Sequence, residues 1–172
     1  MSDPPDRLVT PVGLRSPELV FENKISKDQD IWSFGCMIFE LLTSRQLFLV
    51  GTMASDEEID DDHFLQFYDI LGPLPSRILS QYPRARVYCN GQGEKVKHYI
   101  GDLPEGFDPN EIQPMPSLEQ FFDQERPAEL SVEEAGVIKG LLRQILDYDP
   151  CKRPSASELL RHPWFSNMGN VN

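Results

Sequence analysis

The sequence predicts a mainly helical domain in which other elements surround one central helix. At several points a serine stands three residues before a glutamine or glutamate, which is a signature of helix N-termini, whereas signals for β-strands are weak. The segment from about Gln29 to Thr43 carries apolar residues on every side of a helical cylinder, as is typical of a helix buried within a domain. With 172 residues, 40% of them hydrophobic and 26% charged, the chain fits one globular domain with a real core.

The first third of the chain should pass from irregular structure into two helices. Prolines and glycines interrupt the first 25 residues, so no continuous helix is expected there. The box Ser26–Gln29 then opens the central helix. The acidic run Asp56–Asp62 lacks the Asp/Gly spacing of a calcium loop, so we interpret it as a loop and the first turn of a helix, where the macrodipole favours negative charge. Apolar residues recur at helical spacing over Phe64–Leu71, and Gly72 followed by Pro73 stops this helix.

The region 73–116 is rich in proline and glycine and should contain little regular structure. Weak strand signals lie around Arg86–Tyr88 and Lys95–Tyr99, on either side of Asn90-Gly91. An Asn-Gly pair favours the tight turn of a β-hairpin, so a small hairpin is expected here.

The last third should hold three helices, each opened by a serine box. Ser117–Gln120 caps a short turn of helix. Ser131–Glu134 opens a longer helix that Pro150 ends, and Ser155–Glu158 opens the last helix, which Pro163 closes. The apolar face of the longer helix consists of Ile138, Leu141, Leu142, Ile145 and Leu146.

Charge and cysteine content exclude several classes of function. The net charge is −12, and without a basic run the chain is a poor candidate for nucleic-acid binding. The cysteines, Cys36, Cys89 and Cys151, are odd in number and form no CxxC, so neither a zinc site nor a disulfide framework is indicated and a reducing compartment is expected.

The N-terminus does not resemble a signal peptide, and the apolar stretch Ile31–Leu42 is shorter than the about 20 residues that a membrane span requires. We therefore expect a soluble intracellular chain.

Four motifs in a fixed order carry a family resemblance. They are Ser16-Pro17-Glu18, Asp30-x-Trp32-x-x-Gly35, the stretch Asp147–Pro154, and Arg161–Phe165. From about Thr10 to Phe165 the chain resembles the C-terminal part of the large lobe of a eukaryotic protein kinase, closest to the SR-protein kinases and their fungal relatives. The resemblance implies a flexible N-terminus over 1–9, a partial kinase domain over 10–165 that lacks the small lobe and the catalytic loop, and a C-terminal tail over 166–172.

The resemblance implies structural roles for single residues. Glu18 should form a buried ion pair with Arg153, across 135 residues of sequence. In the family, the aspartate at the position of Asp30 accepts hydrogen bonds from the catalytic loop, so this carboxylate should be underpaired or solvated here. Trp32 should belong to the core, and Gly35 should allow close helix packing.

The resemblance also places a substrate-docking loop at Pro11, Val12, Gly13, Leu14 and Arg15, in the region that contacts the residue after the phosphorylation site. The family usually has a threonine seven residues before the signature glutamate, and Pro11 stands there, with Thr10 one position away. Proline has no hydroxyl, so docking should be altered. Arg15 could bind an acidic or phosphorylated group, but a structural role for it is at least as well supported.

The motifs that hold nucleotide and metal in this family are absent from these 172 residues. There is no glycine-rich phosphate loop, no His-Arg-Asp catalytic loop and no Asp-Phe-Gly. Gly91-Gln92-Gly93 does not continue as a glycine-rich loop. We therefore expect no catalytic, cofactor-binding or metal-binding residue in this chain, and no kinase activity of the chain alone. ATP and Mg²⁺ belong to the complete domain of the family.

Two alternatives to a partial serine/threonine kinase remain. The chain could be a non-catalytic protein-interaction module, similar to a pseudokinase, or one piece of a split kinase. The segments that would cover one side of the central helix are missing, so we expect exposed apolar surface and association through it. The resemblance allows a location in the cytoplasm or the nucleus.

Overall fold

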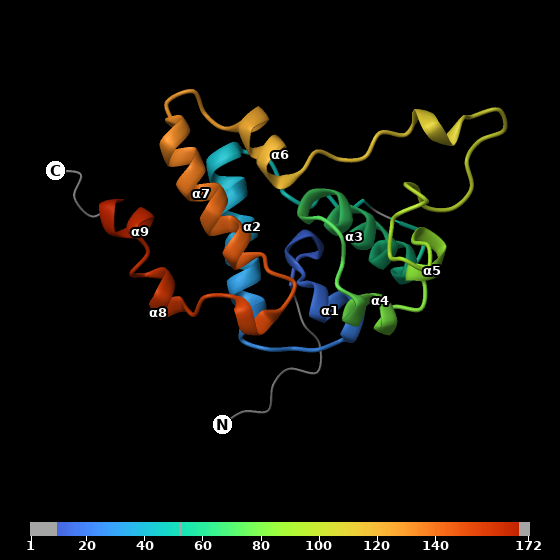
Figure 1. Cartoon of the computed structure of the whole chain (residues 1–172), viewed down its shortest axis with the longest axis horizontal. Coiled ribbons are helices and arrows are strands. Elements are labelled where there is room, and N and C mark those ends of the chain that lie inside the picture. The colour runs from blue at the N-terminus through green and yellow to red at the C-terminus, as the bar shows by residue number, and fades with distance from the viewer. Residues whose placement is uncertain (1–9, 52, 169–172) are drawn as a thin grey trace.

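The central feature of the fold is a pair of packed helices, α2 (Asp28–Thr43) and α7 (Val132–Ile145), shown in Figure 1. The computed structural model describes residues 10–51 and 53–168. The expected N-terminal segment 1–9 lies outside the described residues, as do residues 169–172 of the expected tail. A third helix, α6 (Leu118–Glu125), contacts both members of the pair.

The remaining helices are shorter or lie beside this pair. On one side, α3 (Asp56–Leu71) contacts α1 (Pro17–Glu22) and α6, and α1 also contacts α4 (Ser76–Gln81). Figure 1 shows a long irregular excursion that leaves the body of the molecule before the chain returns to α6. The shorter elements are η1 (Val12–Leu14), α5 (Ala85–Tyr88), η2 (Pro109–Glu111), η3 (Pro150–Lys152), α8 (Ala156–Leu159) and α9 (Pro163–Met168).

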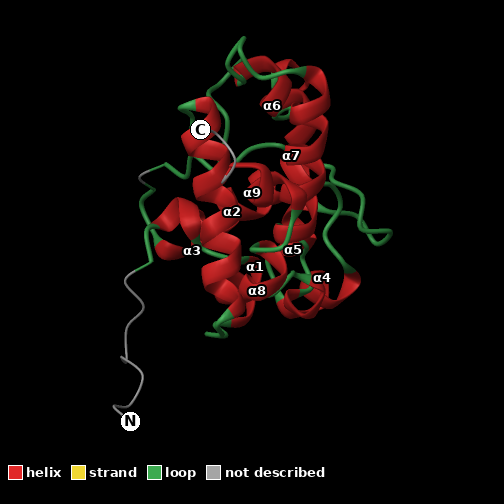
Figure 2. Ribbon diagram, turned by 90° about the vertical axis from the view of Figure 1, so that its left-hand side faces the viewer, coloured by secondary structure: helices red, strands yellow, loops and turns green. Residues whose placement is uncertain are grey.

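The mainly helical fold expected from the sequence is confirmed. Figure 2 shows helices and loops and no strand in the part of the chain that is described. Pairing of the β type is limited there to one isolated bridge between Cys89 and Lys95.

An aromatic cluster forms the core beneath α2. The Trp32 ring stacks on Phe48 at a centroid distance of 5.8 Å, and Phe67 meets both rings edge-on. Phe21 joins this cluster from α1 through an edge contact with Phe67 at 5.9 Å. These rings come from four separate parts of the chain, so burying them ties the first segment to α2 and α3.

One face of α2 remains open. Phe34, Met37 and Leu41 are exposed by 37%, 46% and 79%, and we call these three residues the apolar stripe. Phe165 of α9 stacks on Phe34 at 5.9 Å. Exposed apolar surface on one side of the central helix was expected from the sequence, and no element within residues 10–51 and 53–168 covers the stripe fully.

Of the four boxes predicted at Ser26, Ser117, Ser131 and Ser155, three are confirmed. Ser117, Ser131 and Ser155 each accept a hydrogen bond from the backbone of the third following residue, whose side chain bonds back to the serine. The box Ser26–Gln29 is wrong. Lys27 is the N-cap of α2 and makes no side-chain cap, because the Gln29 side chain bonds to the segment before α1 instead.

The expected hairpin is also wrong, because neither arm forms a strand and the second arm contributes only the isolated bridge residue Lys95. Residues 85–88 form α5, a single helical turn that buries Ala85 and Tyr88 on one side. Tyr88 packs on Phe64 of α3 at a ring distance of 5.6 Å. A strand would place Arg86 on the same face as Tyr88, so a helical turn keeps the arginine in solvent while burying the tyrosine.

Helix ends near the C-terminus differ from expectation in two places. α7 stops at Ile145, with Leu146 as its C-cap, before Pro150 is reached. Pro163 was expected to close the last helix, but it opens a further helix, α9, which runs to Met168 and thus into the expected tail. Proline suits the first helical position because its missing N–H has no partner there in any case.

We expect Gly35→Ala to destabilise the protein. A Cβ atom at Gly35 of α2 would lie 2.4 Å from Cγ2 of Ile145 and 3.1 Å from Cδ2 of Leu146. Overpacking of this kind costs about 1–3 kcal/mol. Urea unfolding of the variant should show a lower midpoint with an unchanged slope.

Gly140→Ala is the matched control for this prediction. Gly140 lies in α7, and nothing stands within 4 Å of its added Cβ, so alanine there should stabilise by up to about 1 kcal/mol through helix propensity. Equal shifts for the two variants would contradict close packing of α2 on α7.

Candidate functional site

The loop Pro11–Arg15, which we call the docking loop after the role expected for it, lies against α2 and α3 and is held by its carbonyl groups. The side chain of Gln29 donates to the Leu14 carbonyl at 2.9 Å, and the Ser33 hydroxyl donates to the same oxygen at 3.0 Å. His63 of α3 places its Nε2 2.9 Å from the Val12 carbonyl. Two helices therefore fix the two ends of the short η1 turn.

The loop also packs closely on the backbone that follows α2. A Cβ atom at Gly13 would lie 2.5 Å from the Phe48 carbonyl oxygen, so a larger residue would push the loop outward. A cavity of about 240 Å³ opens beside it, lined by Pro11, Gly13, Leu14, Cys36, Glu40, Gln46, Leu47 and Phe48. Burial raises the pKa of the Cys36 thiol well above its usual range, so this thiol has no nucleophilic character at neutral pH.

Ser16 joins the loop to α2 through Gln29. Gln29 Oε1 accepts from the Ser16 backbone N–H at 3.0 Å and from its hydroxyl at 2.5 Å. Both residues are buried, and the Gln29 amide uses its oxygen and its nitrogen for this segment. The serine that stands where the family signature has alanine therefore has a hydrogen-bonding role.

Glu18 and Arg153 lie together. Both carboxylate oxygens of Glu18 accept from the Arg153 guanidinium at 2.7 Å, in a bidentate arrangement. The two side chains are 3% and 0% exposed. Arg153 also donates to the carbonyls of Asp28 and Asp147, and its guanidinium lies 4.9 Å from the Trp32 ring centroid. This arginine thus joins the first segment, α2 and the stretch before α8.

The α2 motif residues have different surroundings. Trp32 is fully buried in the aromatic cluster, and its Nε1 has no hydrogen-bond partner. Gly35 allows the close approach of Ile145. Asp30 is exposed, and its carboxylate makes no hydrogen bond or ion pair within the residues that the structure describes.

Arg15 lies near α3 rather than in open solvent. It is half-buried, and its charge acts on Asp60 and His63. Burial raises the pKa of the Asp60 carboxyl to about 6, although Arg15 acts in the opposite direction. For His63, burial lowers the pKa below 6.5; the Val12 and Ile59 carbonyls act to raise it, and Arg15 lowers it further.

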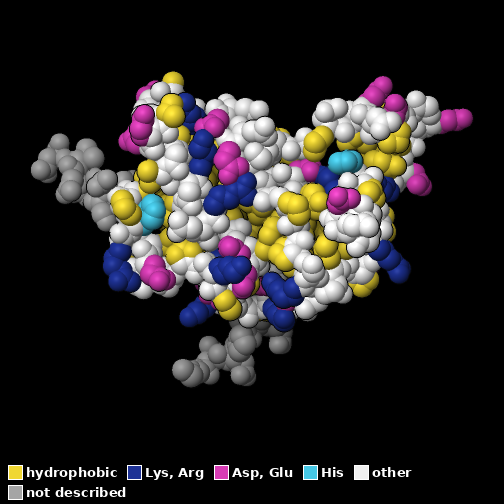
Figure 3. Space-filling view, in the orientation of Figure 1, with side chains coloured by type: hydrophobic (Ala, Val, Ile, Leu, Met, Phe, Trp, Pro, Cys, Tyr) yellow, Lys and Arg dark blue, Asp and Glu magenta, His cyan; other side chains and the backbone are white. Residues whose placement is uncertain are grey.

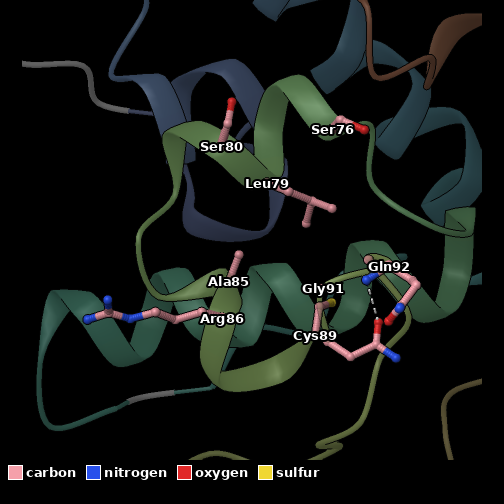
Figure 4. A pocket seen from close by; sticks show the side chains of 10 residues that line it. Ser76, Leu79, Ser80, Ala85, Arg86, Cys89, Gly91 and Gln92 are labelled. Atoms are coloured by element: carbon pink, nitrogen blue, oxygen red, sulfur yellow. Dashed lines mark hydrogen bonds between the residues drawn. The ribbon is translucent and has the colours of Figure 1, made fainter.

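A second cavity, of about 420 Å³, lies between α4 and the segment that contains α5 (Figure 4). Leu79 points into it from α4, and the turn from Asn90 to Gly93 closes the opposite side. Burial raises the pKa of the Cys89 thiol at its edge. This cavity therefore contains no activated nucleophile.

The described residues offer no fitting site for a metal. No group of three or more His, Cys, Asp or Glu side chains that could hold an ion is found among residues 10–51 and 53–168. Within the same part of the chain, no helix is both long enough and apolar enough to cross a membrane.

Comparison with known proteins identifies the family. The protein kinase domain family matches residues 3–165. The chain belongs to the protein kinase family. The matched region begins seven residues before Thr10 and ends at Phe165.

Similar kinases share about a third of their aligned residues with this chain. Serine/threonine-protein kinase SKY1 of Saccharomyces cerevisiae is 34% identical over 89% of this chain, and dual specificity protein kinase lkh1 of Schizosaccharomyces pombe is 30% identical over 88%. Serine/threonine-protein kinase SRPK of Physarum polycephalum is 27% identical over 90%. These similarities support a kinase of the SR-protein-kinase-like type. The chain spans 19%, 20% and 33% of the lengths of SKY1, lkh1 and SRPK.

Sequence reasoning missed three residues of this kinase lobe. His63 and Gln29 hold the docking loop, and Asp61, predicted only as one carboxylate of a loop and first helical turn, is fully buried. Asp61 accepts from Arg84 and from the Tyr82 hydroxyl. The serine in the Ser-Pro-Glu signature was the one local signal available, because a buried hydroxyl requires a partner.

Proposed function

We propose that this chain forms the substrate-side part of a serine/threonine kinase that phosphorylates basic, serine/arginine-rich proteins. Its part is to position the docking loop, and the nucleotide and Mg²⁺ are held by family residues that these 172 positions do not include. The chain alone is inactive in this proposal. The observation that carries it is the bidentate Glu18–Arg153 bridge, which anchors the segment just after the docking loop in the interior.

The charge of the surface supports a basic substrate. Between His98 and Glu125 there are seven acidic residues and no lysine or arginine. Figure 3 shows acidic side chains at the end of the projecting excursion. Arginine-rich segments would be attracted to such a surface, and acidic ones repelled.

The apolar stripe favours a second candidate, in which the chain acts as a non-catalytic interaction module or as one piece of a split kinase. Exposed apolar surface of this kind marks contact with another protein segment.

For both candidate functions we propose an intracellular location, because the three cysteines are free thiols. We also propose the boundaries 10–165 for the kinase part.

A chimera tests the main proposal. Residues 10–165 of this chain would replace the corresponding part of yeast SKY1, so that SKY1 supplies the nucleotide-binding half. We expect ATP-dependent phosphate transfer to a serine/arginine-rich peptide. Glu18→Gln in the chimera should lower the rate at least about tenfold, because the docking segment loses its buried anchor.

Arg45→Met serves as the control, since Arg45 forms an exposed pair with Glu125 and should change the rate little. A chimera that is folded but transfers nothing to this peptide would contradict the proposal. Equal transfer to an acidic serine peptide would contradict the proposed substrate class.

A further inference from the structure

His63 lies between two backbone carbonyl groups. Its Nδ1 is 2.8 Å from the Ile59 carbonyl of its own helix, and its Nε2 is 2.9 Å from the Val12 carbonyl of the docking loop. The side chain is fully buried and packs beside the Phe67 ring at 5.5 Å. Both neighbours accept hydrogen bonds, but a neutral imidazole has only one N–H to donate.

The two carbonyls differ in how much they depend on His63. The Ile59 carbonyl belongs to α3, whose regular pattern already supplies a backbone N–H four residues later. The Val12 carbonyl accepts the Arg15 N–H at 3.1 Å within the η1 turn, and among the described residues the His63 ring is the one hydrogen-bond partner that α3 offers it. A proton on Nε2 therefore adds a link between two elements, whereas a proton on Nδ1 adds none.

We propose that His63 is a positioning residue of the docking loop, and that its neutral form, with the proton on Nε2, holds Val12 against α3. Gln29 performs the same task at the other end of the loop through Leu14. The role of the loop in substrate docking rests on the proposed function, but the link between α3 and the loop does not.

The surrounding charges determine the effect of pH. Arg15, from the loop segment, and Asp62, next to His63 on α3, are the charged groups that act on the imidazole. Burial and Arg15 keep the pKa of His63 in the closed state below 6.5. In the closed state, with Val12 held against α3, His63 binds its proton less tightly than it would in an open state with a solvated imidazole. Protonation of His63 therefore destabilises the closed state relative to the open one. A charged imidazolium could donate to both carbonyls, but burial disfavours the charge more than these two hydrogen bonds favour it, so falling pH should release the loop as His63 becomes charged.

The test is hydrogen exchange of the Leu14 and Arg15 amides, measured by mass spectrometry on the full chain at dilute concentration. Asparagine places its amide where Nδ1 lies, and glutamine can reach the position of Nε2. His63→Asn should speed exchange of these amides about tenfold, the effect of losing one buried hydrogen bond, and His63→Gln should restore most of the protection. Equal exchange in the two variants would overturn the proposal.

The pH profile supplies a second readout. In the natural chain, protection of these amides, corrected for intrinsic exchange, should fall below about pH 6.5, and His63→Gln should remove this dependence. Asp60 also titrates near pH 6 beside Arg15, so Asp60→Asn is the control and should leave the profile in place. A profile that persists in His63→Gln and disappears in Asp60→Asn would assign the effect to Asp60 and overturn the proposal.

The exchange experiment requires no kinase activity. If it succeeds while the SKY1 chimera stays inactive, the link between α3 and the loop stands and only the proposed docking function fails. If the chimera is active and the two His63 variants exchange alike, only the assignment of His63 fails.

Discussion

Glu18→Gln is expected to lower the free energy of unfolding by roughly 3–5 kcal/mol. The substitution leaves the Arg153 guanidinium, which is 0% exposed, without its counter-charge. Water cannot reach the guanidinium to compensate, and two hydrogen bonds of 2.7 Å to a charged acceptor are lost or weakened. Urea unfolding at neutral pH measures the change.

A double substitution separates the penalty of a broken pair from the net value of an intact one. Glu18→Gln combined with Arg153→Met removes both charges, so the pair of changes should cost less than the sum of the two single changes. Glu125→Gln is the control, because Glu125 pairs with the exposed Arg45 and should cost at most about 1 kcal/mol. A loss below that value for Glu18→Gln would contradict a buried bridge.

Arg84→Ala is expected to cost about 2 kcal/mol, less than a fully buried pair, because the Arg84 side chain is 43% exposed and solvent screens its charge. Its partner Asp61 is fully buried, and Arg84 Nε donates to the two carboxylate oxygens at 2.9 and 3.0 Å. The Tyr82 hydroxyl still donates to Asp61 at 2.7 Å, which limits the loss further. Arg86→Ala, at an exposed position of α5, should change stability by no more than about 0.5 kcal/mol.

The Asp61–Arg84 pair also predicts how the free energy of unfolding depends on pH. Burial by itself would raise the pKa of the Asp61 carboxyl, but the hydrogen bonds from Arg84 and Tyr82 outweigh burial and keep it below 3.8. A carboxyl whose pKa is lowered on folding stabilises the protein above its unfolded pKa, and this contribution is lost as the pH falls through the folded value. The difference between Arg84→Ala and the natural chain should therefore shrink from about pH 7 to about pH 3, as urea unfolding at each pH would show. A difference that grows at low pH would contradict this account.

Local features of the fold could be predicted from the sequence, and long-range polar contacts could not. The serine boxes at Ser117, Ser131 and Ser155 depend only on residues three positions apart, so their helices begin where the pattern indicates. The box at Ser26 fails because Gln29 bonds to Ser16, thirteen residues away, and no local pattern contains that competition.

In the candidate site, too, some contacts could be predicted from the sequence and others could not. Glu18 and Arg153 could be paired in advance only because both lie in motifs of a recognised family; spacing alone says nothing about two residues 135 positions apart. His63 and Asp61 stand in a helix whose acidic and apolar residues suggest an ordinary amphipathic surface. Their burial depends on where the docking loop and Arg84 lie, and this is decided by tertiary packing.

The central claim is that this chain supplies the substrate-side part of a kinase and no nucleotide site of its own. Kinases accelerate phosphate transfer mainly by holding phosphates, metal and hydroxyl in line. The most direct test is calorimetric titration of the purified 172-residue chain with ATP–Mg²⁺, with the SKY1 chimera as the positive control. We predict no saturable heat for the chain alone and saturable binding for the chimera. Saturable nucleotide binding by the chain alone would contradict the account.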